Sequence, residues 1–370
     1  MYVPKYTITT EILKNIGWVE AAREVINNAP IVPAWEAKFR DEARLRAVHY
    51  GTILEGNDLT LGQAKLIMDR GMDDPNQASE AGVVARERDV QEVINYRKVL
   101  DYVESMQEPA GKNEAGLADY TSEVLLAIHK LVVDKSVEVG HAGAFRQVQV
   151  VLRNSVTGEV GFRPPASSEV AGLVASFLEW LNSGKGRQEH PVIRAGIAHY
   201  VLAAVHPFVE GNGRAARAFA TMVLYLEGYD IRRFFALEEY FDKHAEEYFG
   251  SLMEVSNQSA VLSERDLTPW LTVFTRALSS ELTKIKDKVR ELSVDIKIKH
   301  RMGRQVQISE RQMKLMEYLH SNGEMSMPEA KKILPMVSDD TILRELKALI
   351  EKGVITKRGS TKAAKYALKK

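Results

Sequence analysis

The chain has 370 residues, carries 50 basic and 50 acidic side chains, and contains no cysteine. A chain of this length can form two or three domains, and its balanced charge excludes recruitment to nucleic acid or membrane by a global electrostatic field. The lack of cysteine excludes disulfides and thiolate metal sites and fits a reducing compartment. The first residues form no apolar signal core, and no apolar run approaches the length of a membrane span. We therefore expect a soluble cytoplasmic protein with no membrane partner.

Apolar residues at helical spacing in a charged background predict three helices in the first third of the chain. These helices are expected at about residues 33–50, 60–71 and 78–107. A polar stretch with proline and glycine, residues 108–113, then breaks the pattern. We place a boundary here, so that residues 1–110 form an N-terminal helical region and residues 111–298 form the core.

A short segment, Thr52-Ile53-Leu54-Glu55-Gly56-Asn57, follows the first of these helices. Taken alone, it is an ordinary helix end, in which Gly56 and Asn57 cap the last turn and Glu55 is solvated.

The core is expected to begin with a helix over residues 120–133 and to continue with a β-hairpin. Two β-prone runs, residues 147–152 and 160–162, flank a polar turn that contains glycine. An extended edge of this kind can pair with an extended segment of another protein, although a plain surface hairpin would show the same pattern. The later segment 191–205 is almost wholly apolar and predicts a buried helix that holds the following loop rigidly.

The most informative stretch comes next and reads His206-Pro207-Phe208-Val209-Glu210-Gly211-Asn212-Gly213-Arg214-Ala215-Ala216-Arg217. His206 can take a proton near neutral pH. Glu210 offers the hard oxygen ligands that Mg²⁺ takes from one or two carboxylates. Gly211 and Gly213 let the backbone turn and approach a ligand closely.

A helix rich in alanine and leucine is expected from about Arg214 to Gly228. The glycine turn at its start presents unpaired N–H groups to an anion, with the helix dipole in favour. Arg214 and Arg217 lie on one face and supply forked donors for phosphate oxygens. Each feature alone is ordinary, but a base, a metal ligand and an anion cradle in one loop indicate chemistry on a nucleoside polyphosphate.

This stretch resembles the signature of the Fic family, His-Pro-Phe-x-Asp/Glu-Gly-Asn-Gly-Arg-x-x-Arg, with every specified position filled. The resemblance covers about residues 115–260, including residues 143–150 at the start of the family's flap and the helix from about 168 to 182. No Walker-type phosphate loop occurs in the sequence, so a P-loop nucleotidase is not the alternative. The resemblance implies a mainly α fold with a Fic-type helical core and a β-hairpin flap.

The resemblance also implies an activity and a set of site residues. Fic proteins mostly transfer AMP from ATP to a hydroxyl of a target protein, with a histidine such as His206 as catalytic base and Mg²⁺ on a carboxylate such as Glu210. The residues expected to bind ATP are Gly211, Asn212, Gly213, Arg214, Ala215, Ala216, Arg217, Tyr248 and Asn257. The aromatic pair Tyr248-Phe249 and Asn257 would line the adenine pocket, although an aromatic pair on a helix is more often part of the core. The flap residues expected to dock the target are Val151, Leu152, Arg153 and Asn154.

The segment that ends in Glu55-Gly56-Asn57 resembles the inhibitory motif of the family, Ser/Thr-x-x-x-Glu-Gly/Asn. Glu55 would pair with Arg217 and so prevent ATP from binding productively. The chain departs from the motif at Gly51, where a hydroxyl residue is expected, and the hydroxyl stands one place later at Thr52. We therefore expect a looser restraint than usual.

A long helix over residues 267–298 leads to a C-terminal domain, residues 299–370, of different character. From residue 301 onward, 15 basic residues stand against 8 acidic ones. Three helices and a basic hairpin are expected at about residues 309–319, 327–334, 338–352 and 353–368. This order resembles a winged helix, a module that binds DNA or proteins. Acidic residues near the start of its third helix, among them Asp339 and Asp340, disfavour DNA.

Together these features predict a protein adenylyltransferase that modifies a Ser, Thr or Tyr hydroxyl and is autoinhibited by Glu55. Its expected partners are ATP with Mg²⁺, a target protein, and a second copy of itself as the object of self-modification or in a homodimer. Two alternatives stay open: a Fic core that serves as nucleotide sensor for a DNA-binding winged helix, and transfer or removal of another phosphoryl moiety. The complete set of His206, Glu210 and Arg217 favours the enzyme, because a pure sensor needs no base.

Overall fold

The computed structural model describes residues 2–31, 33–107, 119–138, 140–153, 160–292, 308–359 and 364–369. The described residues form two compact units. The larger unit comprises Met1–Ala29 and Glu36–Arg290, and the smaller comprises Pro30–Trp35 and Glu291–Lys370.

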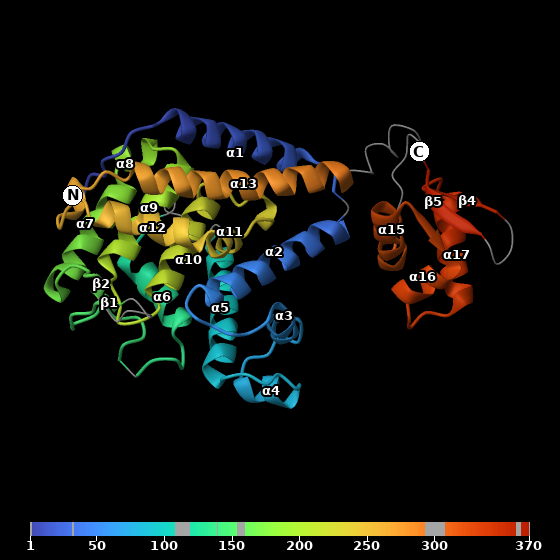
Figure 1. Cartoon of the computed structure of the whole chain (residues 1–370), viewed down its shortest axis with the longest axis horizontal. Coiled ribbons are helices and arrows are strands. Elements are labelled where there is room, and N and C mark those ends of the chain that lie inside the picture. The colour runs from blue at the N-terminus through green and yellow to red at the C-terminus, as the bar shows by residue number, and fades with distance from the viewer. Residues whose placement is uncertain are drawn as a thin grey trace. The chain divides into compact units, whose positions relative to one another are not determined.

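The larger unit is mainly helical (Figure 1). Its helices are α1 (Thr10–Asn28), α2 (Pro33–Ile53), α3 (Leu61–Asp69), α4 (Pro75–Glu80), α5 (Glu87–Ser105), α6 (Ser122–Val132), α7 (Val170–Asn182), α8 (Gly184–Gln188), α9 (Pro191–Val205), α10 (Asn212–Leu226), α11 (Leu237–Lys243), α12 (Ala245–Ser256) and α13 (Thr268–Leu292), with short 3₁₀ turns at η2 (Ser167–Glu169), η3 (Ile231–Arg233) and η4 (Leu262–Glu264). Because α5 packs against α6 and α10, the helices that precede the expected core lie in the same compact unit as the core.

The centre of this unit is the pair α9 and α10, which pack against each other and are buried along almost their whole length. Pro191 is the first residue of α9, where the backbone N–H that proline lacks would have no partner within the helix. His190 Nδ1 accepts a hydrogen bond from Val192 N at 3.3 Å. On the outside, α1 and α13 lie side by side (Figure 1), and Asn15 Nδ2 donates to Thr275 Oγ1 at 3.2 Å. The buried helix predicted over residues 191–205 is therefore present and central.

Two helix predictions differ from the structure. The single helix expected over residues 78–107 is two helices, α4 and α5, and Gly82 between them has φ of 84°, outside the helical region. Helix α1 was not predicted, because apolar residues stand on its buried and its exposed sides alike. Ile12 is fully buried, whereas Leu13 next to it is 63 % exposed, so no single apolar face marks the helix.

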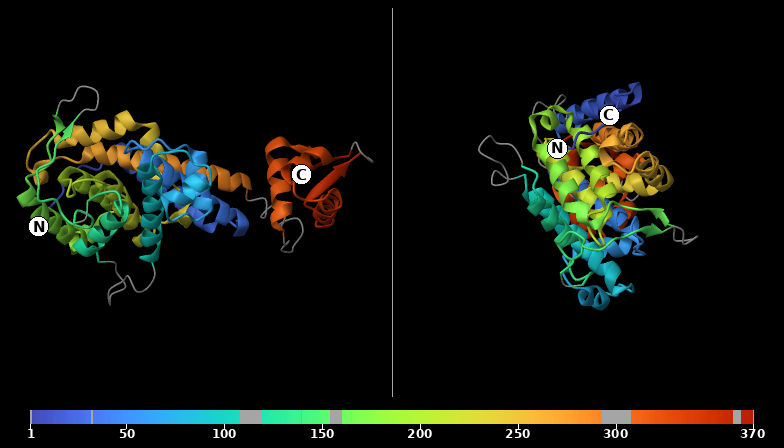
Figure 2. Two further views of the ribbon diagram at one scale, coloured as in Figure 1. Left: turned by 90° about the horizontal axis from the view of Figure 1, so that it is seen from below. Right: turned by 90° about the vertical axis from the view of Figure 1, so that its left-hand side faces the viewer.

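The expected hairpin is present as β1 (Leu152–Arg153) paired antiparallel with β2 (Val160–Phe162). The first strand is shorter than predicted, because side chains rather than a neighbouring strand bind the backbone carbonyls that precede it. Arg146 Nη1 donates to Val148 O at 3.1 Å, and Gln149 Nε2 donates to Val150 O at 3.1 Å. Both views of Figure 2 place this hairpin at the periphery of the larger unit.

The described part of the smaller unit contains three helices and a three-stranded antiparallel sheet in the order β3-β5-β4. Its elements are α15 (Glu310–Asn322), β3 (Glu324–Ser326), α16 (Met327–Ile333), α17 (Asp339–Glu351), β4 (Ile355–Arg358) and β5 (Lys365–Leu368). A separate apolar core that includes Leu319, Met325 and Leu346 holds them together. This is the order expected of a winged helix, with β3 added, a strand too short to give a periodic signal in the sequence. Binding of DNA stays a prediction.

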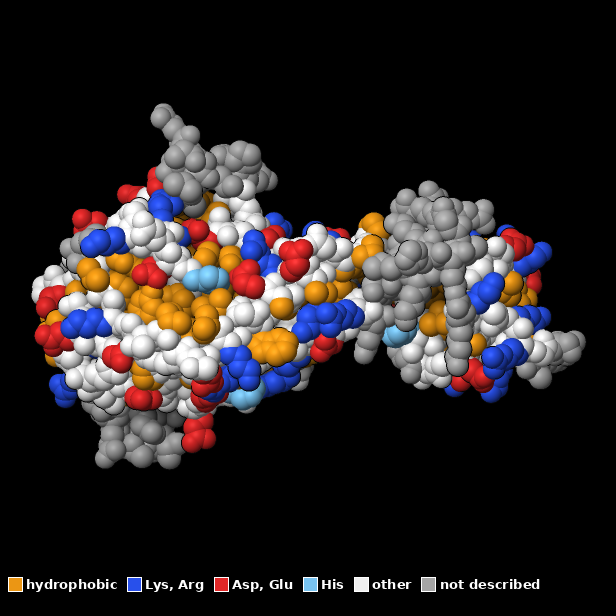
Figure 3. Space-filling view, turned by 90° about the horizontal axis from the view of Figure 1, so that it is seen from above, with side chains coloured by type: hydrophobic (Ala, Val, Ile, Leu, Met, Phe, Trp, Pro, Cys, Tyr) orange, Lys and Arg blue, Asp and Glu red, His pale blue; other side chains and the backbone are white. Residues whose placement is uncertain are grey.

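Apolar side chains gather on the face of the larger unit that carries α1 (Figure 3). Leu13 and Trp18 on this helix are 63 % and 47 % exposed, and the Lys286 ammonium lies 5.2 Å from the centre of the Trp18 ring. The homodimer expected from the sequence stays a prediction, and it would bury surface of this kind. Within the described ranges, no helix is long and apolar enough to cross a membrane.

Candidate active site

The loop between α9 and α10 is held in one conformation by its own side chains. His206 ends α9 in the left-handed region at φ 51° and ψ 59°, and Gly211 precedes α10 at φ 77°. The buried Asn212 amide closes the loop from inside, because Phe208 N donates to Asn212 Oδ1 and Asn212 Nδ2 donates to Phe208 O, both at 2.9 Å. The asparagine of the signature therefore stabilises the loop, and both its amide oxygen and its amide nitrogen are already hydrogen-bonded to the backbone.

A buried histidine from α6 supports the same loop. The His129 ring stacks on Phe208 with ring centres 3.6 Å apart. His129 Nδ1 accepts from Gly143 N at 3.1 Å, so Nε2 carries the hydrogen and donates to Glu210 O at 3.0 Å. Burial lowers the pKa of His129 to about 3, with a contribution from Arg214, so the ring is neutral and structural. Sequence reasoning missed it, although a histidine on the apolar face of the predicted helix 120–133 is a usable signal.

Arg146 ties three segments together through backbone carbonyls. Its guanidinium is buried and donates to His206 O at 2.8 Å, to Pro165 O at 2.6 Å and to Val148 O at 3.1 Å. Its own N–H donates to Pro207 O at 2.9 Å. The end of α9, the start of the flap and the segment after the flap are thus fixed to one side chain. Sequence reasoning assigned no role to this arginine.

The imidazole of His206 is neutral and offers one ring nitrogen as an acceptor. Its Nδ1 lies 3.3 Å from Ala203 O, a contact that places the hydrogen on Nδ1 and leaves Nε2 as the acceptor. Burial lowers the pKa of His206 to about 4, even though the Ala203 carbonyl and the Glu55 carboxylate act in the opposite direction. The imidazole is therefore neutral at neutral pH and able to accept a proton.

The two arginines of the signature are buried at the start of α10, and Glu55 pairs with the second. Arg217 Nη2 donates to Glu55 Oε1 at 2.8 Å and to Gly51 O at 2.9 Å. Burial acts to raise the pKa of Glu55, but the charges of Arg217 and Arg214 outweigh it and hold that pKa below its usual value. The contact between Glu55 and Arg217 that the sequence predicted is present.

Glu55 lies directly against the backbone of the anion cradle. A Cβ built on Gly213 would come within 2.1 Å of Glu55 Oε1, so only glycine leaves room for the carboxylate there. The N-terminal N–H groups of a helix favour an anion at this position. The carboxylate thus occupies the part of the cradle in which we expect a phosphate group.

The departure from the inhibitory motif at Gly51 has a packing cause. A Cβ at residue 51 would lie 2.6 Å from the Tyr96 ring, which is fully buried and donates its hydroxyl to Glu238 Oε1 at 2.9 Å. The hydroxyl of Thr52 does not replace the missing one, because it donates to the His49 carbonyl of its own helix at 2.9 Å. The backbone carbonyl of Gly51 contacts Arg217 instead.

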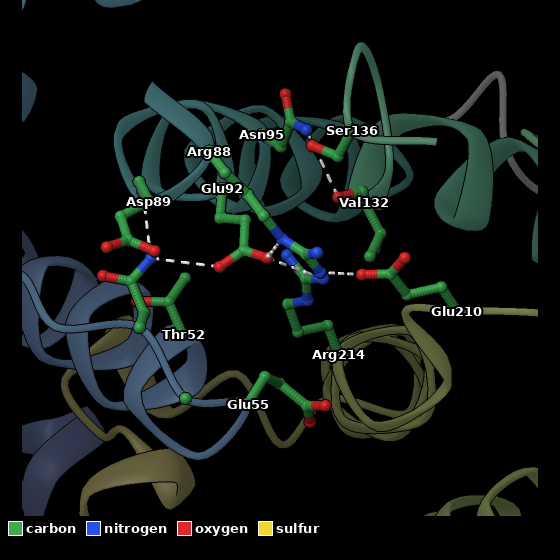
Figure 4. A network of polar contacts seen from close by, with 12 residues as sticks. Thr52, Glu55, Arg88, Asp89, Glu92, Asn95, Val132, Ser136, Glu210 and Arg214 are labelled. Carbon is green, nitrogen blue, oxygen red and sulfur yellow. Dashed lines mark hydrogen bonds and ion pairs between the residues drawn. The ribbon is translucent and has the colours of Figure 1, made fainter. Parts of the chain in front are cut away.

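Glu210, the expected metal ligand, has a side chain that is 34 % exposed and pairs with Arg88 from α5. Figure 4 shows this pair together with Arg214 and Glu92, whose side chains approach to 3.3 Å. In the part of the chain that the structure describes, no group of three His, Asp or Glu side chains could hold a metal by itself. A single accessible carboxylate fits Mg²⁺, which completes its shell with water and substrate phosphates.

The two residues expected at the adenine ring lie in different surroundings. Tyr248 is 2 % exposed, stacks on Phe241 with ring centres 4.5 Å apart, and receives a contact from Arg217 Nη1 at 3.5 Å. Asn257 caps the end of α12, is exposed, and borders a cavity of about 790 Å³ that the segment Gly161–Pro165 also lines. The roles of Tyr248 and Asn257 in adenine binding stay predictions.

The remaining predicted site residues are placed as follows. Val151 and Leu152 in the flap are 38 % and 40 % exposed, Arg153 lies in β1, and Asn154 falls outside the described residues. Ala215 and Ala216 are buried in α10, so they can contribute backbone only. Docking of a target by the flap stays a prediction.

The rigid loop with a neutral histidine at one end and a cationic helix start at the other lies within a segment that matches a known protein family. Residues 119–224 match the model of the Fic/DOC family. The chain is 30 % identical over 182 residues to the protein adenylyltransferase fic-1 of Caenorhabditis briggsae, and 28 % identical over 192 residues to the protein adenylyltransferase Fic of Drosophila grimshawi. Residues 119–224 therefore form a domain of the Fic/DOC family.

These alignments cover 49 % and 52 % of this chain but 32 % and 35 % of the two relatives, so the chain spans about a third of their length. In structure, the chain is similar to a Fic family protein from Desulfovibrio desulfuricans G20, with a TM-score of 0.65 and 22 % identity. The superposition covers 100 % of this chain and 98 % of that one. A fragment of Fic-1 from C. elegans gives a TM-score of 0.55 at 20 % identity, over 77 % of this chain and 73 % of that one. Likeness at these identities concerns the fold.

We predict that Gly51→Ala lowers stability. The added methyl group meets the buried Tyr96 ring, and overpacking of this kind costs about 1–3 kcal/mol, whereas the gain in helix propensity is only about 0.5–1 kcal/mol. The control is Gly17→Ala in α1, where nothing lies within 4 Å of the added Cβ and the substitution should stabilise. Denaturant unfolding of both variants checks this, and equal effects would contradict the packing account.

Proposed function

We propose that this chain transfers AMP from ATP to a hydroxyl group of a protein and releases pyrophosphate. The observation that carries the proposal is the neutral imidazole of His206, which shares one rigid loop with the cationic start of α10. The name of the curated relatives, protein adenylyltransferase, supports the same reaction.

In the proposed mechanism, His206 Nε2 accepts the proton of a Ser, Thr or Tyr hydroxyl as its oxygen attacks the α-phosphorus of ATP. A bond forms between these two atoms, the bond from the α-phosphorus to the oxygen that bridges to the β-phosphate breaks, and pyrophosphate leaves with that electron pair. The proton then passes from His206 to solvent. Arg214 and the N–H groups at the start of α10 hold phosphate oxygens throughout. Mg²⁺, when bound at Glu210, would neutralise charge on the phosphates.

We further propose that Glu55 restrains this reaction. Its carboxylate contacts Arg217 and lies against Gly213, where the terminal phosphate of ATP would otherwise be bound. ATP can then bind only in an arrangement in which its α-phosphate is turned away from the line of attack, and such misplacement affects turnover more than affinity. The restraint can also act on modification of the chain by itself.

The partner of the smaller unit is a separate question. Its described elements follow winged-helix order, and DNA is the partner in the alternative hypothesis of a nucleotide sensor. Asp339 and Asp340 are exposed at the start of α17, where they would repel phosphate groups, and this supports a protein partner instead.

We predict that His206→Ala binds ATP but loses transfer by a factor of about 10² to 10⁴, the usual effect of removing a general base. The measurement uses labelled ATP with Mg²⁺ in a Glu55→Gly background, and follows label on the chain and on added proteins. His141→Ala is the matched control, because His141 is an exposed histidine outside the loop. Full transfer by His206→Ala would remove the histidine from the mechanism.

We also predict that transfer resists mild acid. Because burial lowers the pKa of His206 to about 4, the base stays unprotonated well below pH 6.5. The rate at saturating Mg²⁺ and ATP should therefore stay level between about pH 8 and 5.5 and fall only toward pH 4. The pKa of His206 is lower in the folded chain than in the unfolded chain. Protonation of His206 therefore does not affect the free energy of unfolding above about pH 6.5, and it lowers that free energy as the pH falls from 6.5 toward 4. Circular dichroism at each pH separates unfolding from titration, and a rate that halves near pH 6.5 in folded protein would contradict this assignment.

A third prediction concerns the restraint. Glu55→Gly should raise self-modification by about tenfold or more, because the pair it removes is a charge-assisted hydrogen bond worth about 1.5–3 kcal/mol. Arg217→Ala should lower it. Asp58→Gly is the control. It removes the same negative charge three residues away from Glu55, but Asp58 pairs with Arg86 and not with Arg217. If Glu55→Gly and Asp58→Gly behave alike, Glu55 is only a charge at a helix end.

A further inference from the structure

Two charged pairs with exchanged signs, one on α5 and one at the start of α10, contact each other directly (Figure 4). On α5, Arg88 and Glu92 stand four residues apart, on one face of the helix. On the loop and α10, Glu210 and Arg214 have the same spacing. Arg88 pairs with Glu210, and Glu92 pairs with Arg214 at 3.3 Å. An arginine from outside the Fic domain thus contacts the carboxylate that we expect to hold the metal.

The two halves of this arrangement differ in burial. The side chains of Glu92 and Arg214 are 4 % and 2 % exposed. Glu92 is also fixed from behind, because Asn57 Nδ2 donates to its Oε2 at 3.0 Å. Arg88, in contrast, has a side chain that is 57 % exposed, and its Nε donates to Glu92 Oε1 at 3.3 Å. Glu92 is therefore a fixed anchor, and Arg88 is an exchangeable group attached to it.

The guanidinium of Arg214 is only partly satisfied by Glu92. Glu92 engages Arg214 Nη2, whereas Nε and Nη1 of Arg214 are buried and have no hydrogen-bond partner among the described residues. Buried donors without a partner are costly, so these two nitrogens would gain from binding an anion such as a phosphate. Glu92 therefore orients Arg214 without occupying it fully.

We propose that Arg88 is an internal counterion of the metal site: it occupies the Glu210 carboxylate until a divalent cation arrives with the nucleotide, and Glu92 holds it in place. This proposal rests on the proposed function for the role of Glu210. It adds a second restraint to that of Glu55, which lies against Gly213, three residues after Glu210. Glu55 stands where a phosphate would bind, and Arg88 stands where the cation would bind.

The physical consequence is competition between a metal ion and a guanidinium group. A divalent cation at Glu210 must displace Arg88, and its apparent affinity is lowered by the strength of the pair that it breaks. Exposed ion pairs are weak, so the exchange lies within reach of ordinary metal concentrations. Arg88 then swings into solvent, because more than half of its side chain is already exposed.

The test measures binding rather than catalysis. The ligand is ADP, which carries no γ-phosphate for Glu55 to oppose. Its dissociation constant is determined with EDTA and with Mn²⁺, and the constant with EDTA divided by the constant with Mn²⁺ reports the contribution of the metal. In Arg88→Met this ratio should rise by about 2- to 5-fold, the range for releasing an exposed ion pair. Arg86→Met is the matched control, because Arg86 lies on the same helix end with a similar exposure of 60 % but pairs with Asp58 and Asp89; its ratio should match wild type.

A second variant tests the assignment of the carboxylate. Glu210→Gln should abolish the effect of Mn²⁺ on ADP binding, and adding Arg88→Met to it should change nothing. An unchanged ratio in Arg88→Met, or an equal rise in Arg86→Met, would overturn the proposal. ADP cannot donate AMP with release of pyrophosphate, so these binding results are independent of transfer. If the chain fails to transfer AMP but shows the Mn²⁺ effect, only the proposed function is contradicted. If the chain binds no ADP, both proposals are contradicted.

Discussion

Two guanidinium groups buried at the start of one helix determine how this region is built. Arg214 and Arg217 are 2 % and 3 % exposed, and the helix dipole adds positive charge at the same place. Like charges can be buried there only if anionic groups face them. The chain supplies Glu55 from the turn after α2 and Glu92 from α5. These segments, which precede the Fic domain, are thus bound to it by charge as well as by apolar packing.

The backbone of the signature loop imposes a second constraint. A loop between two helices carries carbonyl groups that no regular element satisfies, and buried carbonyls need donors. His129 and Arg146 provide these donors from α6 and from the start of the flap. Arg146 thereby fixes the backbone at His206, and His129 fixes it at Glu210. Precision at the base depends on residues that do not touch the proposed substrate.

The sequence allowed prediction of those parts of the site that are contiguous in the chain. His206, Glu210 and the glycine turn could be assigned because twelve neighbouring residues combine unusual chemistry at fixed spacing, and the buried helix α9 followed from its apolar composition. Glu55 was assigned only through the resemblance of its segment to a family motif. Its contact with Arg217 is present, whereas the role of Thr52 is not the one the motif would give.

The supporting residues could not be predicted, because their meaning comes from distant segments. Arg146 contacts a residue 60 positions away, and Arg88 contacts one 122 positions away. In the sequence, Arg88 and Glu92 are an ordinary charged pair on a helix surface. The order of the described helices and of β4 and β5 in the smaller unit was predictable from the helix caps and the basic hairpin, whereas the short strand β3 was not.

The contact between Gly51 and the Tyr96 ring has a consequence for how related chains can differ. The space that a hydroxyl residue would fill on α2 is filled here by an aromatic ring from α5, so the two positions share one volume. A relative that carries serine or threonine at the position of Gly51 should carry a side chain smaller than tyrosine at the position of Tyr96. In an alignment of such chains the two positions would covary, and the apparent defect in the motif would be one of two equivalent ways to pack the same pair of helices.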